Sequence, residues 1–384
     1  MDAREHTRLH GPLPRYDRAA LESLASSIGL LGRGGAAFPV ATKLAGLPRG
    51  RTHAVVVNGS ESEPASRKDR MLMRRAPHLV LDGLDLVAHA LRARGLVIAV
   101  HDEASAQSLE HAILERAKPR ARVVRTPARF VSGEARAVIE AVDRRPAVPT
   151  GRRTLPTLSG VRGRPTFLSN AETFAQLAVA ARMGSRFADV GAREEPGTTL
   201  TTVFGPGRTP IVAETPTDAL LGDVLGLVGA ERSTVLVGGY HGTFCRDVDD
   251  LPLSRPALRE HGVSLGAGAL IALSSETCWL RELSAVADYL AAESSGQCGP
   301  CLFGLASIAD DVRRINVGER AAVDRLRSRL GIVPGRGACA HPDGAARMIG
   351  SFLTAAPDEI ALHLAHGTCG RPWRGELPLP GGMR

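Results

Sequence analysis

The chain has 384 residues, of which 43% are hydrophobic and 23% charged, and this balance excludes an intrinsically disordered polypeptide. Its longest charge-free apolar stretch, residues 263–273, is well short of the roughly 20 residues that cross a bilayer, so we expect no direct membrane insertion. The net charge of +8 comes from interleaved acids and bases, and only 4% of residues are aromatic, which argues against nucleic-acid binding. The first residues lack the apolar segment of a secretory signal, so we expect a cytoplasmic protein.

Strand and helix patterns alternate through about the first 190 residues. A helix is predicted over 19–30, and the short apolar runs 53–58 and 96–101 precede helical patterns at 77–91 and 105–117. This alternation predicts a parallel sheet covered by helices on both faces. We therefore expect an α/β domain over residues 1–190.

The texture changes twice in the rest of the chain. Short strands separated by Gly and Pro turns predict a mixed β domain over residues 191–276, with one helix near 218–227. Beyond it, residues 277–384 read as a helical bundle. Its predicted helices cover residues 279–292, 304–315, 319–330, 342–354 and 358–366.

A glycine-rich loop spans residues 32–39, between two predicted helices. Glycines at Gly32, Gly34 and Gly35 let backbone N–H groups approach a phosphate closely, and Lys43 could add a positive charge one turn further on. An ordinary tight turn is the alternative interpretation.

A polar segment, residues 58–70, follows the first buried strand. In open α/β sheets ligands bind beyond the carboxyl ends of the strands, where this segment would lie. Asn58 could hydrogen-bond a heterocycle, and the carboxylates that follow it could hold ribityl or ribose hydroxyls. A solvated polar loop is the alternative.

The cysteines suggest an iron–sulfur site. Cys298 and Cys301 form a CxxC pair, and Cys339 follows at a distance without a second short pair, which fits iron–sulfur better than structural zinc. We expect Cys245, Cys278 and Cys369 to be unreactive thiols.

Taken in order, these segments resemble the NADH-binding flavoprotein subunit of respiratory complex I and related subunits of NAD-linked hydrogenases and formate dehydrogenases. The resemblance runs from about Leu30 to Leu353. Its landmarks are GRGGAAFP (32–39), NGSESEPASRKDR (58–70), GEARA (133–137), GRPTFLSNAET (163–173), GTTLTTVFG (197–205) and ESSGQCGPCLFG (293–304).

The resemblance implies a Rossmann-like FMN domain, a ubiquitin-like β-grasp domain of the soluble-ligand-binding type, and a helical bundle with a [4Fe–4S] cluster. NADH would pass a hydride to FMN without a catalytic side chain, and single electrons would leave through the cluster to a partner such as a [2Fe–2S] or ferredoxin-like subunit. Membrane attachment would come only through a partner. The implied cofactor positions are Gly32, Arg33, Gly34, Gly35, Phe38, Lys43, Asn58, Glu61, Glu63, Gly133, Glu134, Arg152, Asn170 and Thr173, with Phe38 and Glu63 facing the nicotinamide nucleotide.

The sequence departs from the family pattern at the cluster. Ser295 stands where the family has a cysteine, so the expected metal ligands are Cys298, Cys301, Cys339 and Ser295. A serine hydroxyl loses its proton much less readily than a thiol. We therefore expect a [4Fe–4S] cluster with one weak ligand, a three-iron cluster or a labile site, with His341 as a less favoured substitute.

The nucleotide side also departs from the family. Gly46 and Leu155 replace aromatic residues, Ala135 and Ser60 replace acidic residues, and Ser169 replaces an asparagine; Arg152 replaces a lysine and keeps its charge. Two alternatives therefore stay open beside the NADH-dehydrogenase hypothesis. The chain could be an electron carrier that takes electrons from a ferredoxin or flavoprotein, or a cofactor-free scaffold in a redox complex.

Overall fold

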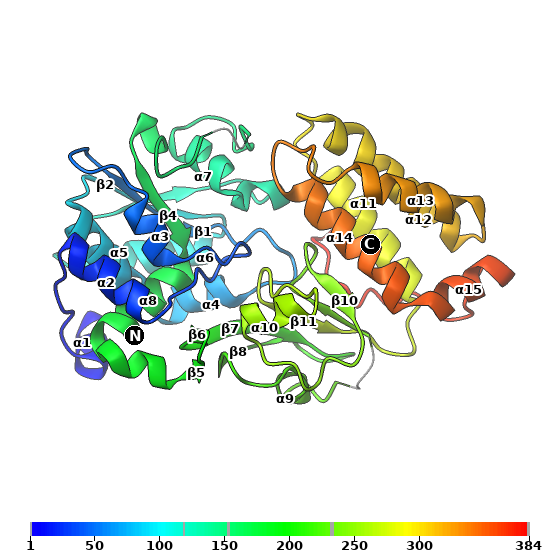
Figure 1. Ribbon diagram of the computed structural model, residues 1–384, viewed down its shortest axis with the longest axis horizontal. Coiled ribbons are helices and arrows are strands. Elements are labelled where there is room, and N and C mark those ends of the chain that lie inside the picture. Colours follow the sequence, from blue (N-terminus) through cyan, green and yellow to red (C-terminus); the bar gives the residue numbers. More distant parts are fainter. Residues whose placement is uncertain (1, 118–119, 152–153, 231–233, 382–384) are drawn as a thin grey trace.

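The computed structural model describes residues 2–117, 120–151, 154–230 and 234–381. Figure 1 shows an α/β part, a mixed-sheet part and a helical part in chain order. The α/β part comprises α1 (Ala3–His10), α2 (Arg18–Ser27), α3 (Val40–Ala45), β1 (Ala54–Gly59), α4 (Lys68–Arg75), α5 (Pro77–Leu91), β2 (Gly95–Val100), α6 (Glu103–Leu114), β3 (Arg122–Arg125), α7 (Ala135–Val142), β4 (Thr166–Asn170) and α8 (Ala171–Met183).

The α/β part is built on a parallel sheet with strand order β3-β2-β1-β4. Along β1, Val55 and Val57 pack on one face, under α2, α5 and α8, while Ala54 and Val56 pack on the other, under α7. Because successive side chains of a strand point to opposite faces, an unbroken apolar strand is stable only when helices cover both faces.

The mixed-sheet part comprises β5 (Gly191–Ala192), β6 (Glu195–Pro196), β7 (Thr198–Phe204), β8 (Ile211–Pro216), α9 (Leu221–Gly226), β9 (Val235–Val237), β10 (Thr243–Cys245), α10 (Arg255–Glu260) and β11 (Ala269–Ala272). Its five-stranded sheet has the order β10-β9-β11-β7-β8. The pair β11–β7 is parallel and the other neighbouring pairs are antiparallel. One face of this sheet packs on α9 and α10, and the other on the helical part.

The helical part comprises α11 (Trp279–Ala292), a π-helical turn (Pro300–Leu305), α12 (Ala306–Asn316), α13 (Ala321–Ile332), α14 (His341–Ala355) and α15 (Pro357–His366). Its core is continuous with the mixed sheet, since Leu236 and Ile271 share a cluster with Leu283 and Phe352. The predicted α/β fold with a parallel sheet and a helical C-terminal part is therefore confirmed.

Several predicted elements differ from those in the structure. The second half of the polar segment, predicted as a loop, forms helix α4, because the Glu61 carboxylate accepts hydrogen bonds from the N–H groups of Asp69 (2.9 Å) and Arg70 (3.1 Å) at its start. The helix predicted over 218–227 shortens to α9, and α1, α10 and β10 were not predicted. Among the described residues, no helix has the length and hydropathy needed to cross a membrane.

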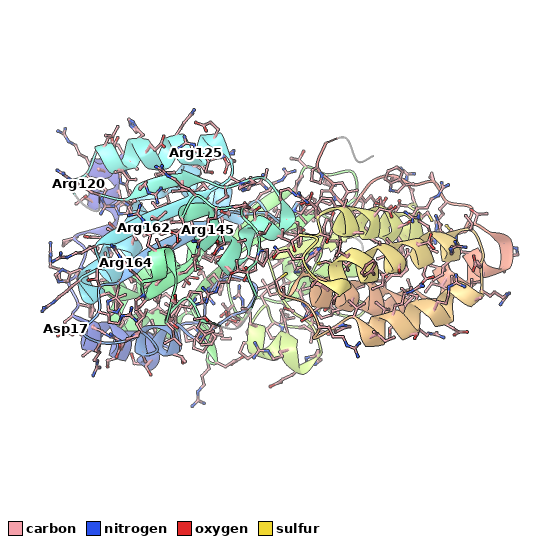
Figure 2. All side chains as sticks on the ribbon, turned by 90° about the horizontal axis from the view of Figure 1, so that it is seen from above. Asp17, Arg120, Arg125, Arg145, Arg162 and Arg164 are labelled. Atoms are coloured by element: carbon pink, nitrogen blue, oxygen red, sulfur yellow. The ribbon has the colours of Figure 1, made fainter. Side chains whose placement is uncertain are left out.

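The surface charge of the α/β part is mixed. Figure 2 labels Arg120, Arg125, Arg145, Arg162 and Arg164 on this part of the molecule. Arg125 pairs with Glu103 (3.0 Å) and Glu110 (2.5 Å), and Arg145 pairs with Glu140. Acidic neighbours thus offset part of the arginine charge, as the interleaved sequence predicts.

Candidate functional site

A cavity of about 550 Å³ is lined by all three parts of the chain. The α/β part contributes the glycine loop and the ends of β1 and β4, the mixed-sheet part contributes Gly238, His241 and Gly266, and the helical part contributes Cys339 and His341. Of the predicted cofactor positions, those lining the cavity are Arg33, Gly34, Gly35, Asn58, Glu61, Glu63, Gly133, Glu134 and Asn170.

Two asparagines mark the strand ends at this cavity. Asn58 and Asn170 are register partners at the carboxyl ends of β1 and β4. The Asn170 side chain caps α8 by accepting the Glu172 N–H (3.0 Å), and its amide donates to Asp69 (2.6 Å). The Asn58 amide donates to the Gly133 carbonyl (2.9 Å). The cavity thus occupies the crevice where open parallel sheets bind ligands.

The glycine loop is held from behind by polar contacts. The Gly32 N–H donates to the Phe38 carbonyl (3.0 Å), and the Arg33 N–H donates to the Thr173 hydroxyl (2.8 Å). The Arg33 guanidinium is fully buried against Glu195, and its burial lowers its pKa to about 10. Gly32 and Thr173 therefore support the loop from outside the cavity lining, while Gly34 and Gly35 form part of that lining.

A buried charge cluster lies beside the strand ends. Lys68 is 2.8 Å from both Asp69 and Glu172. Burial opposes the Lys68 charge, but these two carboxylates outweigh it and raise the lysine pKa above its usual range. Burial also raises the pKa of Asp69 to about 6. Lys68 and Asp69 line the cavity, and they were not among the predicted site residues although they lie within the polar segment.

Glu61 and Glu63 line the cavity in different bonding states. Both Glu61 oxygens accept hydrogen bonds at the start of α4 and one also accepts from the Arg70 side chain (2.9 Å), so this carboxylate serves the helix. Glu63 accepts the N–H groups of Tyr240 (2.9 Å) and Ala65 (3.2 Å), and burial raises its pKa to about 7.

Gly133 and Glu134 form the wall opposite the glycine loop. A Cβ added at Gly133 would overlap the Ser62 hydroxyl oxygen and lie 2.8 Å from the Ser60 carbonyl oxygen, so only glycine fits. The Glu134 side chain caps α7 by accepting the N–H groups of Arg136 (2.8 Å) and Ala137 (3.1 Å).

Other predicted positions lie away from the cavity. Phe38 is 47% exposed and does not line it. Lys43 donates to the Leu168 carbonyl (2.9 Å), and burial lowers its pKa to about 8. Leu155, at one of the replaced aromatic positions, is 61% exposed. Arg152 lies outside the described residues.

The three expected cysteine ligands occupy the helical part next to the cavity. Cys339 lines the cavity and Cys301 is buried at the π-helical turn, while Cys298 is partly exposed. Burial raises the pKa of Cys339 to about 11. Burial also raises the pKa of Cys301, against hydrogen bonds from the Ser294 hydroxyl and the Ser295 N–H. Ser295 therefore lies beside the cysteines with its backbone directed to a sulfur.

His341 is committed to other contacts. Its Nε2 lies 2.9 Å from the Leu290 carbonyl oxygen, which can only accept, so Nε2 carries the proton. Its Nδ1 then accepts from Nε2 of His241, 3.1 Å away. Both ring nitrogens are thus engaged within the protein, which argues against His341 as a substitute cluster ligand.

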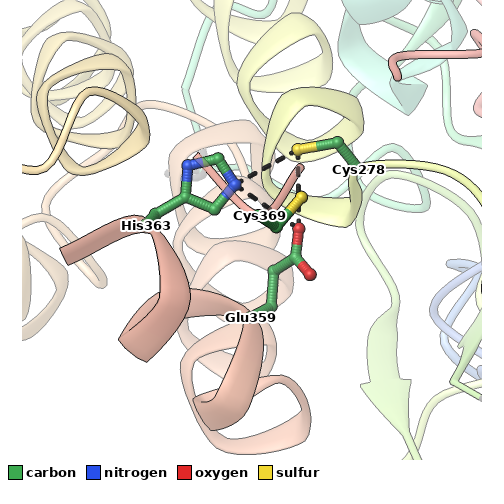
Figure 3. A group of neighbouring side chains, drawn as sticks. All are labelled: Cys278, Glu359, His363 and Cys369. Carbon is green, nitrogen blue, oxygen red and sulfur yellow. Dashed lines mark hydrogen bonds and ion pairs between the residues drawn. The ribbon is translucent and has the colours of Figure 1, made fainter. Parts of the chain in front are cut away.

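A second group of potential ligands lies elsewhere in the helical part. Cys278, Glu359, His363 and Cys369 place their ligand atoms within 4.8 Å of one another (Figure 3). Both thiols were expected to be unreactive, because no short spacing motif joins cysteines 91 positions apart.

Two family models match the chain. Residues 25–179 match the Nuo51 FMN-binding domain, and residues 281–363 match the NADH-ubiquinone oxidoreductase-F iron–sulfur binding region. The first range includes the glycine loop and both strand-end asparagines, and the second includes Cys298, Cys301 and Cys339.

Curated relatives align over most of the chain. A protein of Mycobacterium tuberculosis that is named as a subunit of NADH-quinone oxidoreductase is 30% identical over 378 residues, covering 90% of this chain and 85% of that protein. The mitochondrial NADH dehydrogenase [ubiquinone] flavoprotein 1 of Dictyostelium discoideum is 29% identical, covering 85% of this chain and 74% of that protein.

The fold is also similar to that of solved hydrogenase structures. NAD+-reducing [NiFe]-hydrogenase in the H2-reduced state matches with a TM-score of 0.80 at 24% identity, over 93% of this chain. The air-oxidized state matches with a TM-score of 0.77 at 25% identity, over 94% of this chain. The chain spans 64% and 66% of those hydrogenase chains.

Proposed function

Because the chain belongs to the NADH-ubiquinone oxidoreductase-F family, we propose that it oxidises NADH with a bound FMN and passes single electrons through an iron–sulfur cluster to a partner protein. One observation carries this proposal. The same cavity is lined by the glycine loop and strand ends of the α/β part and by Cys339 of the helical part. A flavin in the cavity and a cluster on Cys339 would therefore be neighbours.

The cavity residues fit FMN. Backbone N–H groups at Gly34 and Gly35 suit a phosphate, and the polar side chains at the strand ends suit the ribityl hydroxyls and the ring edge. When bound, FMN accepts a hydride and releases its electrons one at a time. The residues proposed to hold it are Arg33, Gly34, Gly35, Asn58, Glu63, Lys68, Asp69, Gly133, Glu134 and Asn170, with Gly32, Lys43, Glu61 and Thr173 as supports.

The cysteine set fits an iron–sulfur cluster with one weak position. Cys298, Cys301 and Cys339 supply soft thiolate ligands, and Ser295 is adjacent. Hydrogen bonds from Ser294 and the Ser295 N–H to Cys301 favour its thiolate form. Cys298→Ala is expected to abolish the cluster and leave flavin bound, and full iron content in that variant would contradict the ligand assignment.

We also propose domain limits of 1–190, 191–276 and 277–384, with a β-grasp fold for the middle domain. The strand order β8-β7-β11-β9-β10 supports that fold. In it, an initial hairpin is followed by a helix, and the last strand lies parallel to the first at the centre of the sheet.

An electron-accepting partner is part of this proposal, since the relatives are named as subunits of a quinone oxidoreductase. Leu302 and Phe303, next to Cys301, are 52% and 72% exposed. Apolar side chains exposed beside the cluster ligands support docking of a [2Fe–2S] or ferredoxin-like protein at this point. Any membrane attachment would come through such a partner.

An absorption spectrum of anaerobically purified protein, recorded before and after NADH addition, tests the function. We expect flavin bands and a broad iron–sulfur shoulder, both bleached by NADH. Bands that ignore NADH but bleach with dithionite would indicate a carrier with another electron donor. A colourless protein, also after reconstitution with FMN, iron and sulfide, would leave the scaffold function.

A further inference from the structure

The group formed by Cys278, Glu359, His363 and Cys369 joins three segments of the helical part. Cys278 is the residue before α11, Glu359 and His363 lie one turn apart on α15, and Cys369 follows the glycine that ends α15. Cys278, Glu359 and His363 are each no more than 2% exposed. Figure 3 shows their side chains converging on one point.

The tautomer of His363 directs a free lone pair into this group. Its Nδ1 lies 2.8 Å from the carbonyl oxygen of Asn316, which can only accept a hydrogen bond. Nδ1 must therefore carry the proton, and Nε2 is the unprotonated nitrogen, 3.3 Å from the Cys278 sulfur. A histidine that donates its second nitrogen to a carbonyl is the usual arrangement for a metal ligand.

The separations between ligand atoms match a tetrahedral site. The Cys278 sulfur is 3.5 Å from Oε1 of Glu359, which is 3.6 Å from Nε2 of His363. With Zn–S of about 2.3 Å and Zn–N or Zn–O of about 2.0–2.1 Å, neighbouring ligand atoms lie about 3.3–3.8 Å apart. Closing a metal into the group therefore needs little movement of the three buried ligands.

The charges balance around zinc. Two thiolates and one carboxylate carry a charge of −3, Zn2+ leaves −1, and the Arg371 guanidinium, paired with Glu359, neutralises the remainder. We propose that Cys278, Glu359, His363 and Cys369 form a structural zinc site that ties the start of α11 to α15 and to the segment beyond it.

This site is separate from the proposed cluster. Cys278 precedes α11 and Cys298 follows it, and a helix of 14 residues is about 21 Å long. A chain that binds zinc here has no open position for substrate, since four protein ligands close the coordination shell. Its role is to hold the helical part together, as binding of metal to the folded state alone stabilises that state.

Metal analysis of the full-length protein tests the proposal. Protein purified from zinc-supplemented culture should hold about one zinc per chain, and Cys278→Ser and Cys369→Ser should each lower that content about tenfold. Cys245→Ser is the matched control, because this thiol on β10 is outside the group, and it should keep its zinc. Wild-type protein without zinc, or full zinc in both variants, would overturn the proposal.

Two further measurements separate this site from folding defects and from the proposed function. Co2+ added to zinc-free wild-type protein should give the intense absorption of a tetrahedral thiolate site, and Cys369→Ser, judged folded by circular dichroism, should not. Cys298→Ala should lose iron and keep zinc. Loss of zinc in Cys298→Ala but not in Cys278→Ser would assign the zinc to the CxxC pair and contradict the proposal.

Discussion

Glu63 illustrates how burial sets the charge of a single side chain in the cavity. Its folded-state pKa of about 7 is higher than its ordinary value of 4.5. Between these two values the folded chain keeps a proton that the unfolded chain releases. The stabilisation is therefore complete below about pH 4.5 and is lost as the pH rises through 7.

Replacing Glu63 by the neutral Gln should remove this pH dependence. We expect the free energy of unfolding of Glu63→Gln, relative to wild type, to rise by about 1–3 kcal/mol between pH 5 and pH 8, measured by denaturation of the flavin-free protein. Glu260→Gln changes an exposed carboxylate of α10 and should show no such trend. Stability curves that stay parallel for wild type and Glu63→Gln would rule the explanation out.

Ser295 is the second residue whose chemistry is open to direct test. Ser295→Cys should complete a set of four thiolates, so reconstituted protein should hold about four iron atoms per chain and lose them more slowly in air. Ser328→Cys adds a thiol at an exposed serine of α13 and should change neither quantity. The same iron content and oxygen sensitivity in Ser295→Cys and wild type would exclude Ser295 as a ligand position.

At the scale of elements, the packing of α5 on α8 depends on a glycine. A Cβ added at Gly83 of α5 would overlap the Phe174 carbonyl oxygen of α8, and a backbone atom inside a helix cannot give way easily. At Gly331 of α13 an added Cβ would meet nothing within 4 Å. The two positions therefore form a matched pair of helical glycines.

Gly83→Ala should lower the free energy of unfolding by about 2–3 kcal/mol because the helices must separate. Gly331→Ala should raise it by up to about 1 kcal/mol, since alanine loses less backbone entropy in a helix. Urea denaturation followed by circular dichroism measures both. Equal effects at the two sites would show that α5 and α8 do not pack this closely.

The elements also show what sequence reasoning can reach. Helix α11 was predicted with its observed limits because its apolar residues repeat with helical spacing. Helix α4 was missed because its start depends on Glu61, whose carboxylate reaches its N–H groups only after the chain turns. Periodicity reports burial of one face, whereas capping by a distant side chain leaves no local pattern.

The same distinction holds for the sites. Asn58 and Asn170 were predictable because the carboxyl ends of parallel strands meet at one edge. His241 of the cavity and the pair Cys278 and Cys369 were not, because only the packing of separate parts brings them into place. Phe38 shows the converse case, since its motif predicts a nucleotide contact but its side chain lies outside the cavity lining.

At the scale of the whole molecule, a buried carboxylate joins the α/β part to the mixed-sheet part. Glu195 of β6 pairs with Arg33 of the glycine loop and with Arg255 of α10, where it also accepts the backbone N–H (2.5 Å). All three side chains are almost completely buried. The loop position thus depends on a charge supplied from another part of the chain.

Glu195→Gln should leave two buried guanidinium groups without a counter-charge and lower the free energy of unfolding by about 3–5 kcal/mol. The adjacent Glu194→Gln is the control, because Glu194 is exposed and should change stability by less than about 0.5 kcal/mol. The comparison needs only denaturation curves of the two variants. A loss below about 1 kcal/mol in Glu195→Gln would mean that water reaches the arginines.

The cavity shared by three parts has a consequence for how the molecule assembles. Gly34 and Cys339 line the same space although about 300 residues separate them, so the cavity exists only after the longest loops of the chain have closed. A ligand held there binds no partly assembled form, and at 100 times its dissociation constant it would add about 2.7 kcal/mol to the closed form alone. The cofactor would act as a keystone, and its loss would free the parts to come apart one at a time.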